Sequence, residues 1–414
     1  MKNFFNGNIV YLINRRLCIC QFAGIKVFVF LFMFSGWLFS QNTNPQKEKL
    51  NPLLWQEFEG DRYFKPFVIL EAWVTYSMNE RTVENQYADR VDISLRRIRF
   101  GGIGSPYPWL RYCLQLSMDR LGEDSFASTK GSYQGLDVWN AFVTAKLSKK
   151  SDLLNLHLGY FWPQISREYS TVAWSQGSFD RTRANWYLRR FMTGKGNGIE
   201  TGIALGGLKN YNGFGFSYRI GTFEPKAYSG FEYSSRLYTG HVLFTFGQPE
   251  QNAYKYRLSG NSWRSRKGVS LGVGASSQTN GALNDSVYFD SSNSFGTDIL
   301  VSYTGFRLDA EYFRFYRSAS GFDDFNGTEW HVRLGYSFVA GNKYFEPVIT
   351  YDKFEGWGAK SVYKYIGDDY TVDVGVNWYL NKEKLKLSAH YLVQSGSVSP
   401  NTGDYFGLGC QLKL

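Results

Sequence analysis

The chain has 414 residues, a formal net charge of +10, a pI of about 9.2 and a mean hydropathy of −0.34. This hydropathy excludes a bundle of membrane helices, whereas 18% aromatic residues and 43 glycines suit either a transmembrane β-barrel or a secreted β-sandwich. The basic excess indicates an anionic partner. Because the leader described next directs export, we expect that partner to be a small anion and not a nucleic acid.

Residues 1–40 have the layout of a secretory signal peptide. Arg15, Arg16 and Lys26 precede the apolar run VFVFLFMF at 27–34, and small residues lead to an expected cleavage after Ser40. The apolar run is too short to span a bilayer comfortably. Residues 41–64 are polar and contain two prolines. We expect them to form a periplasmic N-terminal arm.

From residue 65 onward, apolar and polar residues alternate with the period of two that is typical of β-strands. In 371–379, for example, Val372, Val374 and Val376 share one face and Asp373 lies on the other. The segments predicted to be strands are 65–77, 90–104, 109–120, 134–148, 153–160, 199–208, 212–222, 236–247, 268–276, 294–304, 306–317, 328–340, 344–354, 369–380, 384–395 and 404–414.

The intervals between these segments alternate between short turns and long polar loops, as they do in a barrel whose turns gather at one rim. We therefore predict an all-β fold for 65–414: a transmembrane antiparallel β-barrel of about 16 strands in the outer membrane, contacting its lipid. The interval 248–267 breaks the alternation and is either a periplasmic excursion or a missed pair of strands. The phase slip at Arg96 and Arg97 predicts a β-bulge.

The longest interval without strand alternation, residues 161–198, is predicted to be a constriction loop folded into the barrel. Its only acidic residues are Glu168 and Asp180. Its basic residues, the candidate anion-binding set, are Arg167, Arg181, Arg183, Arg189, Arg190 and Lys195. Arginine is suited to this task because its guanidinium stays charged and can bind phosphate or carboxylate through two hydrogen bonds. A solvated surface loop with scattered arginines is the alternative.

A second basic set falls on the polar phase of the strands and is predicted to face the lumen. It consists of Arg111, Lys146, Arg219, Arg333 and Lys386. These residues could pass an anion along the wall. Equally, they could only solvate the wall and pair with nearby acidic residues, for which the candidates are Glu71, Asp119, Asp309 and Asp373.

We expect no catalytic residues, no metal site and no cofactor, and we expect that the protein is not an enzyme. The histidines stand singly in predicted strands, and no nucleophile motif accompanies them; they are His157, His241, His331 and His390. Cys113 and Cys410 lie far apart in sequence, so neither a disulfide framework nor a metal site is indicated.

The chain resembles the phosphate-selective porin family (porin O and P type) of Gram-negative bacteria, in the form found in the Bacteroidetes. The resemblance covers most of 65–414. It rests on LRRIRFG at 95–101 followed by WLRY at 109–112, on LGYFWP at 158–163 with SREYST at 166–171 and FDR at 179–181, and on SWRSR at 262–266. It implies a sixteen-stranded barrel, commonly a homotrimer, whose basic constriction favours anions, and it places Arg167 and Arg181 in matched motifs.

The expected function is passive, anion-favouring diffusion of phosphate or similar small anions through a water-filled pore. Two alternatives remain open. One is a general or sugar-type outer-membrane pore, with Trp174 and Trp186 as an aromatic path for sugars. The other is a secreted soluble β-protein that binds carbohydrate.

Overall fold

The computed structural model describes residues 56–58, 62–81, 86–121, 135–148, 150–225, 235–258, 260–261, 263–282, 288–341, 343–398 and 403–414. The predicted signal peptide therefore lies outside the described residues, as does most of the predicted arm. The strands are β1 (Gln56–Phe58), β2 (Arg62–Arg81), β3 (Tyr87–Tyr107), β4 (Leu110–Ser117), β5 (Asp137–Lys146), β6 (Asn155–Phe161), β7 (Glu200–Tyr211), β8 (Phe214–Phe223), β9 (Leu237–Gly247), β10 (Lys267–Ala282), β11 (Tyr288–Tyr303), β12 (Phe306–Ser318), β13 (Phe325–Tyr336), β14 (Phe338–Ala340), β15 (Lys343–Trp357), β16 (Gly367–Asn381), β17 (Leu385–Gly396) and β18 (Tyr405–Lys413).

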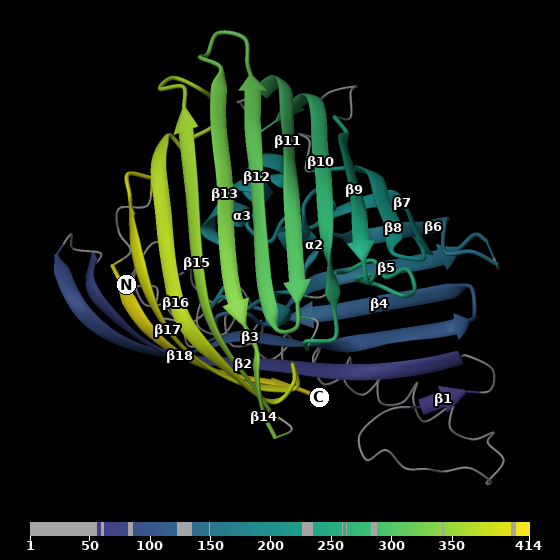
Figure 1. Ribbon diagram of the computed structural model, residues 1–414. Helices are drawn as coiled ribbons and strands as arrows, with labels where there is room; N and C mark the ends of the chain where they lie inside the picture. Colours follow the sequence, from purple (N-terminus) through teal and green to yellow (C-terminus); the bar gives the residue numbers. More distant parts are fainter. Residues whose placement is uncertain are drawn as a thin grey trace, which may run out of the picture. The chain divides into compact units, whose positions relative to one another are not determined.

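These strands form one closed antiparallel barrel (Figure 1). β1 and β14 are only three residues long, and the other strands make the 16-stranded wall that the alternation predicts. Each wall strand pairs with the next in sequence, and β18 pairs with β2 from Tyr405↔Ser77 to Lys413↔Ile69. Closure leaves neither end of the sheet as a free edge, which a membrane-spanning sheet requires.

Along much of the wall, the buried phase of a strand is polar and the exposed phase is apolar, although aromatic residues such as Phe315 and Phe354 are also buried. On β12, Glu311 is 4% exposed while Tyr312 beside it is 44% exposed. On β13, His331 is fully buried whereas Leu334 is 38% exposed. A soluble sandwich would show the opposite arrangement, because its apolar faces meet in a dry core. The outward apolar phase instead fits a lipid-facing surface.

Several predicted boundaries differ from the structure, most of all at β2, β10 and β11. β2 begins at Arg62, inside the predicted arm, and β10 and β11 extend through most of 277–293, which was predicted to be a loop. The runs SSQTNG and FDSSNS lack an apolar phase and so carry no strand signal in the sequence. They are strands nevertheless because their backbone groups pair across the hairpin, for example at Ser277↔Asn293.

The predicted β-bulge is present in β3. Glu71 of β2 pairs with Arg97 and the next residue, Ala72, pairs with Leu95, so the register shifts by one residue at Arg96. An extra residue on one strand changes the direction in which neighbouring side chains point. Arg96 and Arg97 consequently both reach the inside of the barrel, where they contact the same residue of the long loop.

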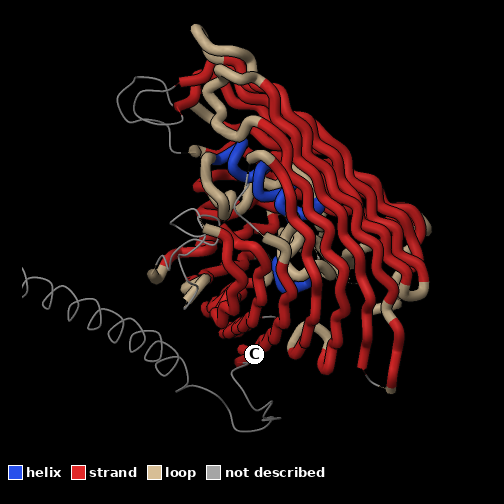
Figure 2. Tube along the Cα trace, turned by 90° about the vertical axis from the view of Figure 1, so that its left-hand side faces the viewer, coloured by secondary structure: helices blue, strands red, loops and turns tan. Residues whose placement is uncertain are grey.

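The long loop between β6 and β7 folds inward, as predicted, and contains short helices that the sequence analysis did not predict. Figure 2 shows these helices on the concave side of the sheet. They are α2 (Arg167–Ser170), the 3-10 turn η1 (Ala173–Ser175) and α3 (Arg183–Thr193). Within the described part of the chain, no helix has the length and apolar character needed to cross a membrane.

Helix α3 is formed and placed by its own sequence. The hydroxyl of Thr182 accepts a hydrogen bond from Asn185 N at 3.2 Å and caps the first turn, and Gly194 ends the helix in the left-handed region at φ 72°. Tyr187 and Phe191 lie four residues apart and so share one face. Tyr187 stacks on Phe354 at 3.8 Å between ring centroids, and Phe191 stacks on Phe315 at 4.9 Å. This face fixes α3 against β12 and β15.

The interval between β9 and β10, residues 248–266, contains no strand among its described residues. It is therefore not a missed strand pair. Tyr254, Tyr256 and Leu258 are all buried, and Leu258 forms an isolated parallel bridge with Thr171 of the loop. The segment contacts the constriction loop instead of extending away from the barrel. We call residues 248–266 the inward turn.

Candidate functional site

One side of the constriction loop is attached to an acidic part of the wall. Carboxylates on three strands accept hydrogen bonds from main-chain N–H groups of the loop: Glu311 Oε2 from Glu168 N at 3.1 Å, Asp352 Oδ1 from Ala184 N at 3.2 Å, and Asp373 Oδ2 from Phe179 N at 2.8 Å. The hydroxyl of Tyr187 also donates to Asp369. Charged acceptors make stronger hydrogen bonds than neutral ones. We call Glu311, Asp352, Asp369 and Asp373 the acidic wall.

Arg167, one of the predicted constriction residues, is paired with two carboxylates. Its Nη1 and Nη2 each lie 2.8 Å from an oxygen of Glu250 in the inward turn, and its Nε lies 3.2 Å from Asp298 Oδ1 on β11. The side chain is 3% exposed. Burial lowers the pKa of Arg167, but the carboxylates of Glu250 and Asp298 outweigh that effect and raise it above its ordinary value. Its charge is therefore balanced by protein groups.

The inward turn supports the loop through further contacts. Leu258 N donates to Ser170 O at 3.0 Å, and Gly260 N donates to Ser175 Oγ at 3.1 Å. The hydroxyl of Tyr256 donates to Trp162 O. The loop is thus held by the acidic wall on one side and by the inward turn on another.

A different part of the loop faces β3 and stays partly exposed. Asp180 accepts hydrogen bonds from Arg96 Nη2 at 2.6 Å and from Arg97, whose Nη1 also donates to Glu71 at 2.6 Å. Asp180 is 22% exposed and Arg96 17% exposed, whereas Arg97 is 4% exposed. Burial raises the pKa of Asp180, but the charges of Arg96 and Arg97 dominate and hold it below its usual range. Asp180 is consequently ionised at neutral pH.

Arg181 and Arg183 follow Asp180 on the same partly exposed part of the loop. Arg181 donates to the carbonyl oxygens of Glu168, at 2.5 Å, and Thr171. Burial and the nearby charge of Arg189 lower the pKa of Arg181 below its ordinary value. Arg183 Nη2 donates to Gln394 Oε1 of β17 at 3.3 Å, and its Nη1 lies 3.6 Å from Asp369 Oδ2.

β3, β5 and the inward turn supply further charged and aromatic groups beside the loop. Arg99 Nη2 lies 2.5 Å from Asp119 Oδ2, and its guanidinium carbon lies 3.6 Å from the ring centroid of Trp139. Arg257 of the inward turn is half-buried, 5.0 Å from the ring of Trp162. We define the passage-facing set as the charged residues around this region that keep partial exposure: Arg96, Asp119, Asp180, Arg181, Arg183 and Arg257.

The remaining predicted loop residues lie on or after α3. Arg189 is 5% exposed, with its guanidinium 5.1 Å from the ring of Tyr169. Arg190 donates to Gly194 O at 3.2 Å and lies 5.0 Å from the ring of Trp186. Lys195 lies 3.0 Å from Glu200 and its side chain is 38% exposed. These three residues extend the basic character of the loop away from Asp180.

The five strand residues predicted to face the lumen have different surroundings. Arg333 pairs with Glu168 at 3.3 Å and Asp309 at 3.2 Å, and Lys146 pairs with Asp152 at 2.6 Å. Lys386 is buried close to the carboxylates of Glu71 and Glu346. Arg219 is 2% exposed beneath the ring of Tyr254. Arg111 is exposed, on the same strand phase as Gln115.

Sequence reasoning did not assign Arg96, Arg97 or Arg257 to the site. Arg96 and Arg97 belong to the LRRIRFG segment, and the phase slip there was visible, but only the position of Asp180 shows what they contact. Arg257 could not be placed because the path of the inward turn depends on tertiary contacts. Trp174, an aromatic proposed for a sugar path, is 6% exposed and packs with Ile69 and Val172.

Comparison with protein families gives one match. A family model described as phosphate-selective porin O and P matches residues 70–404. The match spans most of the barrel and includes β3, the constriction loop and the inward turn. No curated protein matches the chain significantly.

The solved structures that align with the chain include outer-membrane proteins and an anion-selective porin. OmpT of Vibrio cholerae with loop L8 deleted aligns with a TM-score of 0.54 at 10% identity, covering 86% of this chain and 100% of the other. OmpF of Salmonella typhi in complex with daunomycin gives 0.53 at 11%, covering 86% and 99%. An anion-selective porin from Comamonas acidovorans gives 0.52 at 11%, covering 85% and 100%. At these identities the likeness concerns the barrel fold.

Proposed function

The chain belongs to the phosphate-selective porin O and P family and is an outer-membrane porin, and we propose that its pore favours small anions, with phosphate as the model solute. The observation that supports this selectivity is the charge of the passage-facing set. Arg96, Arg181, Arg183 and Arg257 outnumber its two acidic members, Asp119 and Asp180. The family description and the anion-selective neighbour from Comamonas acidovorans agree in sign with this proposal.

The six loop residues predicted from the sequence have two roles in this proposal. Arg181 and Arg183 belong to the passage-facing set and act on the permeating anion directly, whereas Arg190 and Lys195, which also keep partial exposure, add positive charge farther along the loop. Arg167 and Arg189 are almost fully buried and position the loop. Arg181 contributes because burial, and after it the nearby charge of Arg189, disfavour its charged form, as its lowered pKa reflects. An anion in the passage would offset this repulsion.

Permeation requires that an anion be attracted and then released. A guanidinium offers several donors to phosphate oxygens, but sites that bind tightly would stop flux, so the attraction must be spread over several groups. Asp180 limits binding because it draws Arg96 and Arg97 toward itself. The wall residues Arg111, Lys146, Arg219, Arg333 and Lys386 add a basic background; within it, Arg111 is the exposed member.

The test is a measurement of reversal potential in planar lipid bilayers across a gradient of KCl. If the pore favours anions, the reversal potential has the sign of the chloride equilibrium potential. Addition of inorganic phosphate should then reduce the chloride current at millimolar concentration, because phosphate competes for the same guanidinium groups. A potential of the sign set by potassium would refute the proposed selectivity, and a chloride current indifferent to phosphate would refute the phosphate preference.

We also propose that the protein is a homotrimer. The resemblance implies this state, and one neighbour of the same fold, OmpT of Vibrio cholerae, is described in a trimer form. Chemical cross-linking of the protein in its native membrane, followed by denaturing electrophoresis, should give a ladder that ends at three chains. A ladder ending at a single chain would contradict the proposal.

For the N-terminal residues we propose a secretory signal at 1–40 and a periplasmic arm from residue 41 to the start of the barrel, where β2 begins at Arg62. Mass spectrometry of the mature protein purified from the outer membrane should give an N-terminus at Gln41. Retention of residues 1–40 in that protein would contradict the proposed signal peptide. Protease added to intact cells should spare 41–64, since a periplasmic arm is shielded by the membrane.

A further inference from the structure

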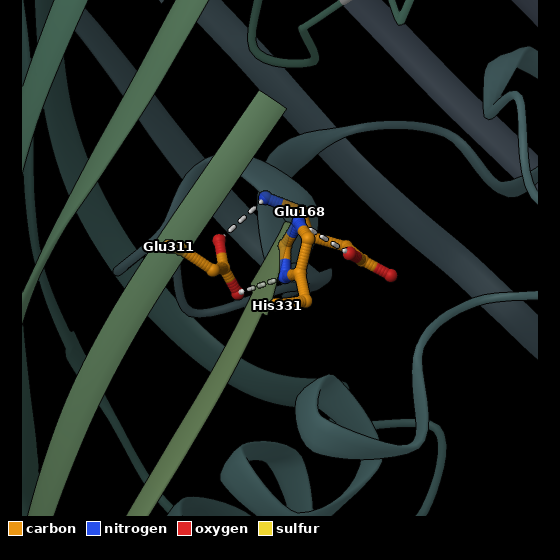
Figure 3. A group of neighbouring side chains, drawn as sticks. All are labelled: Glu168, Glu311 and His331. Atoms are coloured by element: carbon orange, nitrogen blue, oxygen red, sulfur yellow. Dashed lines mark hydrogen bonds and ion pairs between the residues drawn. The ribbon is translucent and has the colours of Figure 1, made fainter. Parts of the chain in front are cut away.

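Three buried side chains from distant parts of the chain meet where the constriction loop touches the wall (Figure 3). They are Glu168 of α2, Glu311 of β12 and His331 of β13, each at most 4% exposed. One ligand-type atom from each lies within 4.8 Å of those of the other two. Imidazole and carboxylate groups in such proximity are the donor set of many divalent metal sites.

The hydrogen bonds of His331 orient its ring. Nε2 lies 3.1 Å from Asp309 Oδ1 and 3.2 Å from Glu168 Oε2 and so donates to a carboxylate. The other nitrogen, Nδ1, faces Glu311 Oε1 at 3.9 Å, which is too long for a hydrogen bond. Histidines that bind metal usually donate their second N–H to a carboxylate in this way, which leaves the lone pair of the first nitrogen available.

The distance between Nδ1 and Glu311 Oε1 suits a bridging cation. Zinc binds imidazole nitrogen and carboxylate oxygen at about 2.1 Å, so two of its ligand atoms lie roughly 3 to 4 Å apart. Neither Nδ1 nor Glu311 Oε1 has a hydrogen-bond partner in the part of the chain that the structure describes. Both atoms are thus buried, polar and available.

Glu329 is a further buried carboxylate in this region whose negative charge is not paired within the described residues. It is fully buried two residues before His331 on the inward face of β13, and neither of its carboxylate oxygens has a partner among the described residues. Its electrostatic neighbours are Glu311, Glu168 and Asp352. Over the described ranges, no lysine or arginine nitrogen lies within 4 Å of Glu311 or Glu329, whereas Glu168 and Asp309 are paired with Arg333. A buried carboxylate without a counter-charge is costly.

We propose that His331, Glu311 and Glu329 bind one divalent transition-metal cation of the Zn²⁺ class, while Glu168 accepts the hydrogen bond of His331 Nε2 and holds the ring in place. An imidazole ligand favours such cations over Ca²⁺ and Mg²⁺, which prefer oxygen ligands alone. The cation joins β12 to β13 beside α2, and it neutralises carboxylates against which the loop is packed. This inference is independent of the proposed ion selectivity, because the site lies behind the loop and not in the passage.

The direct test uses the full-length protein purified in detergent, treated with a chelator and then dialysed against ZnCl₂. Elemental analysis should find one zinc per chain. His331→Gln and Glu329→Gln should each weaken zinc binding about tenfold or more, a typical effect of losing a group from a metal site. His390→Gln is the matched control: His390 is equally buried and lies 2.6 Å from Asp373, but it is not beside unpartnered carboxylates. This variant should bind zinc like the wild type.

Cobalt supplies a readout that does not depend on the variants. CoCl₂ added to the chelator-treated wild-type protein should produce the visible absorption bands of a low-coordinate nitrogen and oxygen site, and equimolar ZnCl₂ should remove them. Unboiled electrophoresis identifies variants that keep the folded barrel. If wild-type protein binds no zinc, or if His331→Gln binds as much as the wild type, the proposal fails and protons balance the buried carboxylates.

Discussion

Arg167 and Glu250 form an ion pair through two hydrogen bonds of 2.8 Å, and this pair joins the constriction loop to the inward turn. The two residues are 83 positions apart in the sequence. Both are buried, with side chains 3% and 7% exposed. An arginine within a loop predicted to bind anions is therefore occupied by carboxylates of the protein itself, which gives it a positioning role.

Breaking this pair from the acidic side should destabilise the protein. Glu250→Gln leaves the guanidinium with Asp298 alone, and removal of one partner of a buried pair costs about 3–5 kcal/mol. Arg167→Met should cost more than Glu250→Gln, because it removes the guanidinium from both Glu250 and Asp298, and Asp298 then keeps only His241 as an ion-pair partner among the described residues. Urea unfolding in lipid vesicles, followed by tryptophan fluorescence, measures both free energies. Equal stability of wild type and Glu250→Gln would contradict the positioning role.

The same pair predicts how stability depends on pH. Burial raises the pKa of Glu250, but the charge of Arg167 outweighs it, and the pKa lies at about 2 in the folded protein. The unfolded value is about 4.3. A carboxyl whose pKa is lower in the folded than in the unfolded protein stabilises the folded state at every pH above its unfolded pKa. This contribution to stability is lost as the pH falls through its folded pKa. The difference between wild type and Glu250→Gln should therefore be constant from pH 9 to 5 and shrink between pH 4 and 2. A difference that stayed constant down to pH 2 would contradict this assignment.

Neutralising the exposed arginines should reduce anion preference. The double variant Arg181→Gln and Arg183→Gln removes two positive charges from the passage-facing set. A unit charge 5 Å from an ion in water contributes roughly 0.8 kcal/mol, so the ratio of chloride to potassium permeability should fall about threefold or more. Arg314→Gln is the control, because Arg314 is exposed on the outward-facing phase of β12. Reversal potentials should change for the double variant and not for the control.

Asp180 should have the opposite effect. Asp180→Asn removes one of the two acidic members of the passage-facing set and releases Arg96 and Arg97 from their shared partner. We expect the permeability ratio to rise about threefold by the same electrostatic reasoning. Asp137→Asn, on an exposed residue at the start of β5, is the comparison. A fall in the ratio with Asp180→Asn would show that its pairing with Arg96 and Arg97 positions the guanidinium groups for anions.

The barrel could be predicted from the sequence because the alternation of apolar and polar residues is set by the immediate surroundings of each strand. Lipid on one side of the wall and the water-filled interior on the other impose a period of two on the sequence, which is visible in segments such as 371–379. The break in that period at Arg96 predicted the β-bulge. The polar ends of β10 and β11 were missed because outside the apolar band the sequence no longer alternates. Ala184, Tyr187 and Phe191 of α3 did carry a helical spacing that could have been recognised.

The environment of the loop arginines could not be predicted in the same way. Whether Arg167 meets an anion or a carboxylate depends on Glu250, and the path of the inward turn is decided by packing of Tyr256 and Leu258. The carboxylates that accept hydrogen bonds from the loop backbone lie 143 to 194 residues away from it in the sequence. Local charge identified a basic loop, but it could not tell which of its residues face the passage.

The order of these partners along the chain has a consequence for biogenesis. The loop is synthesised before β12, β15 and β16, which carry the acceptors that hold it. It can dock fully only once β12, β15 and β16 are in place. The constriction therefore forms late in assembly, close to the step in which β18 pairs with β2 and closes the barrel.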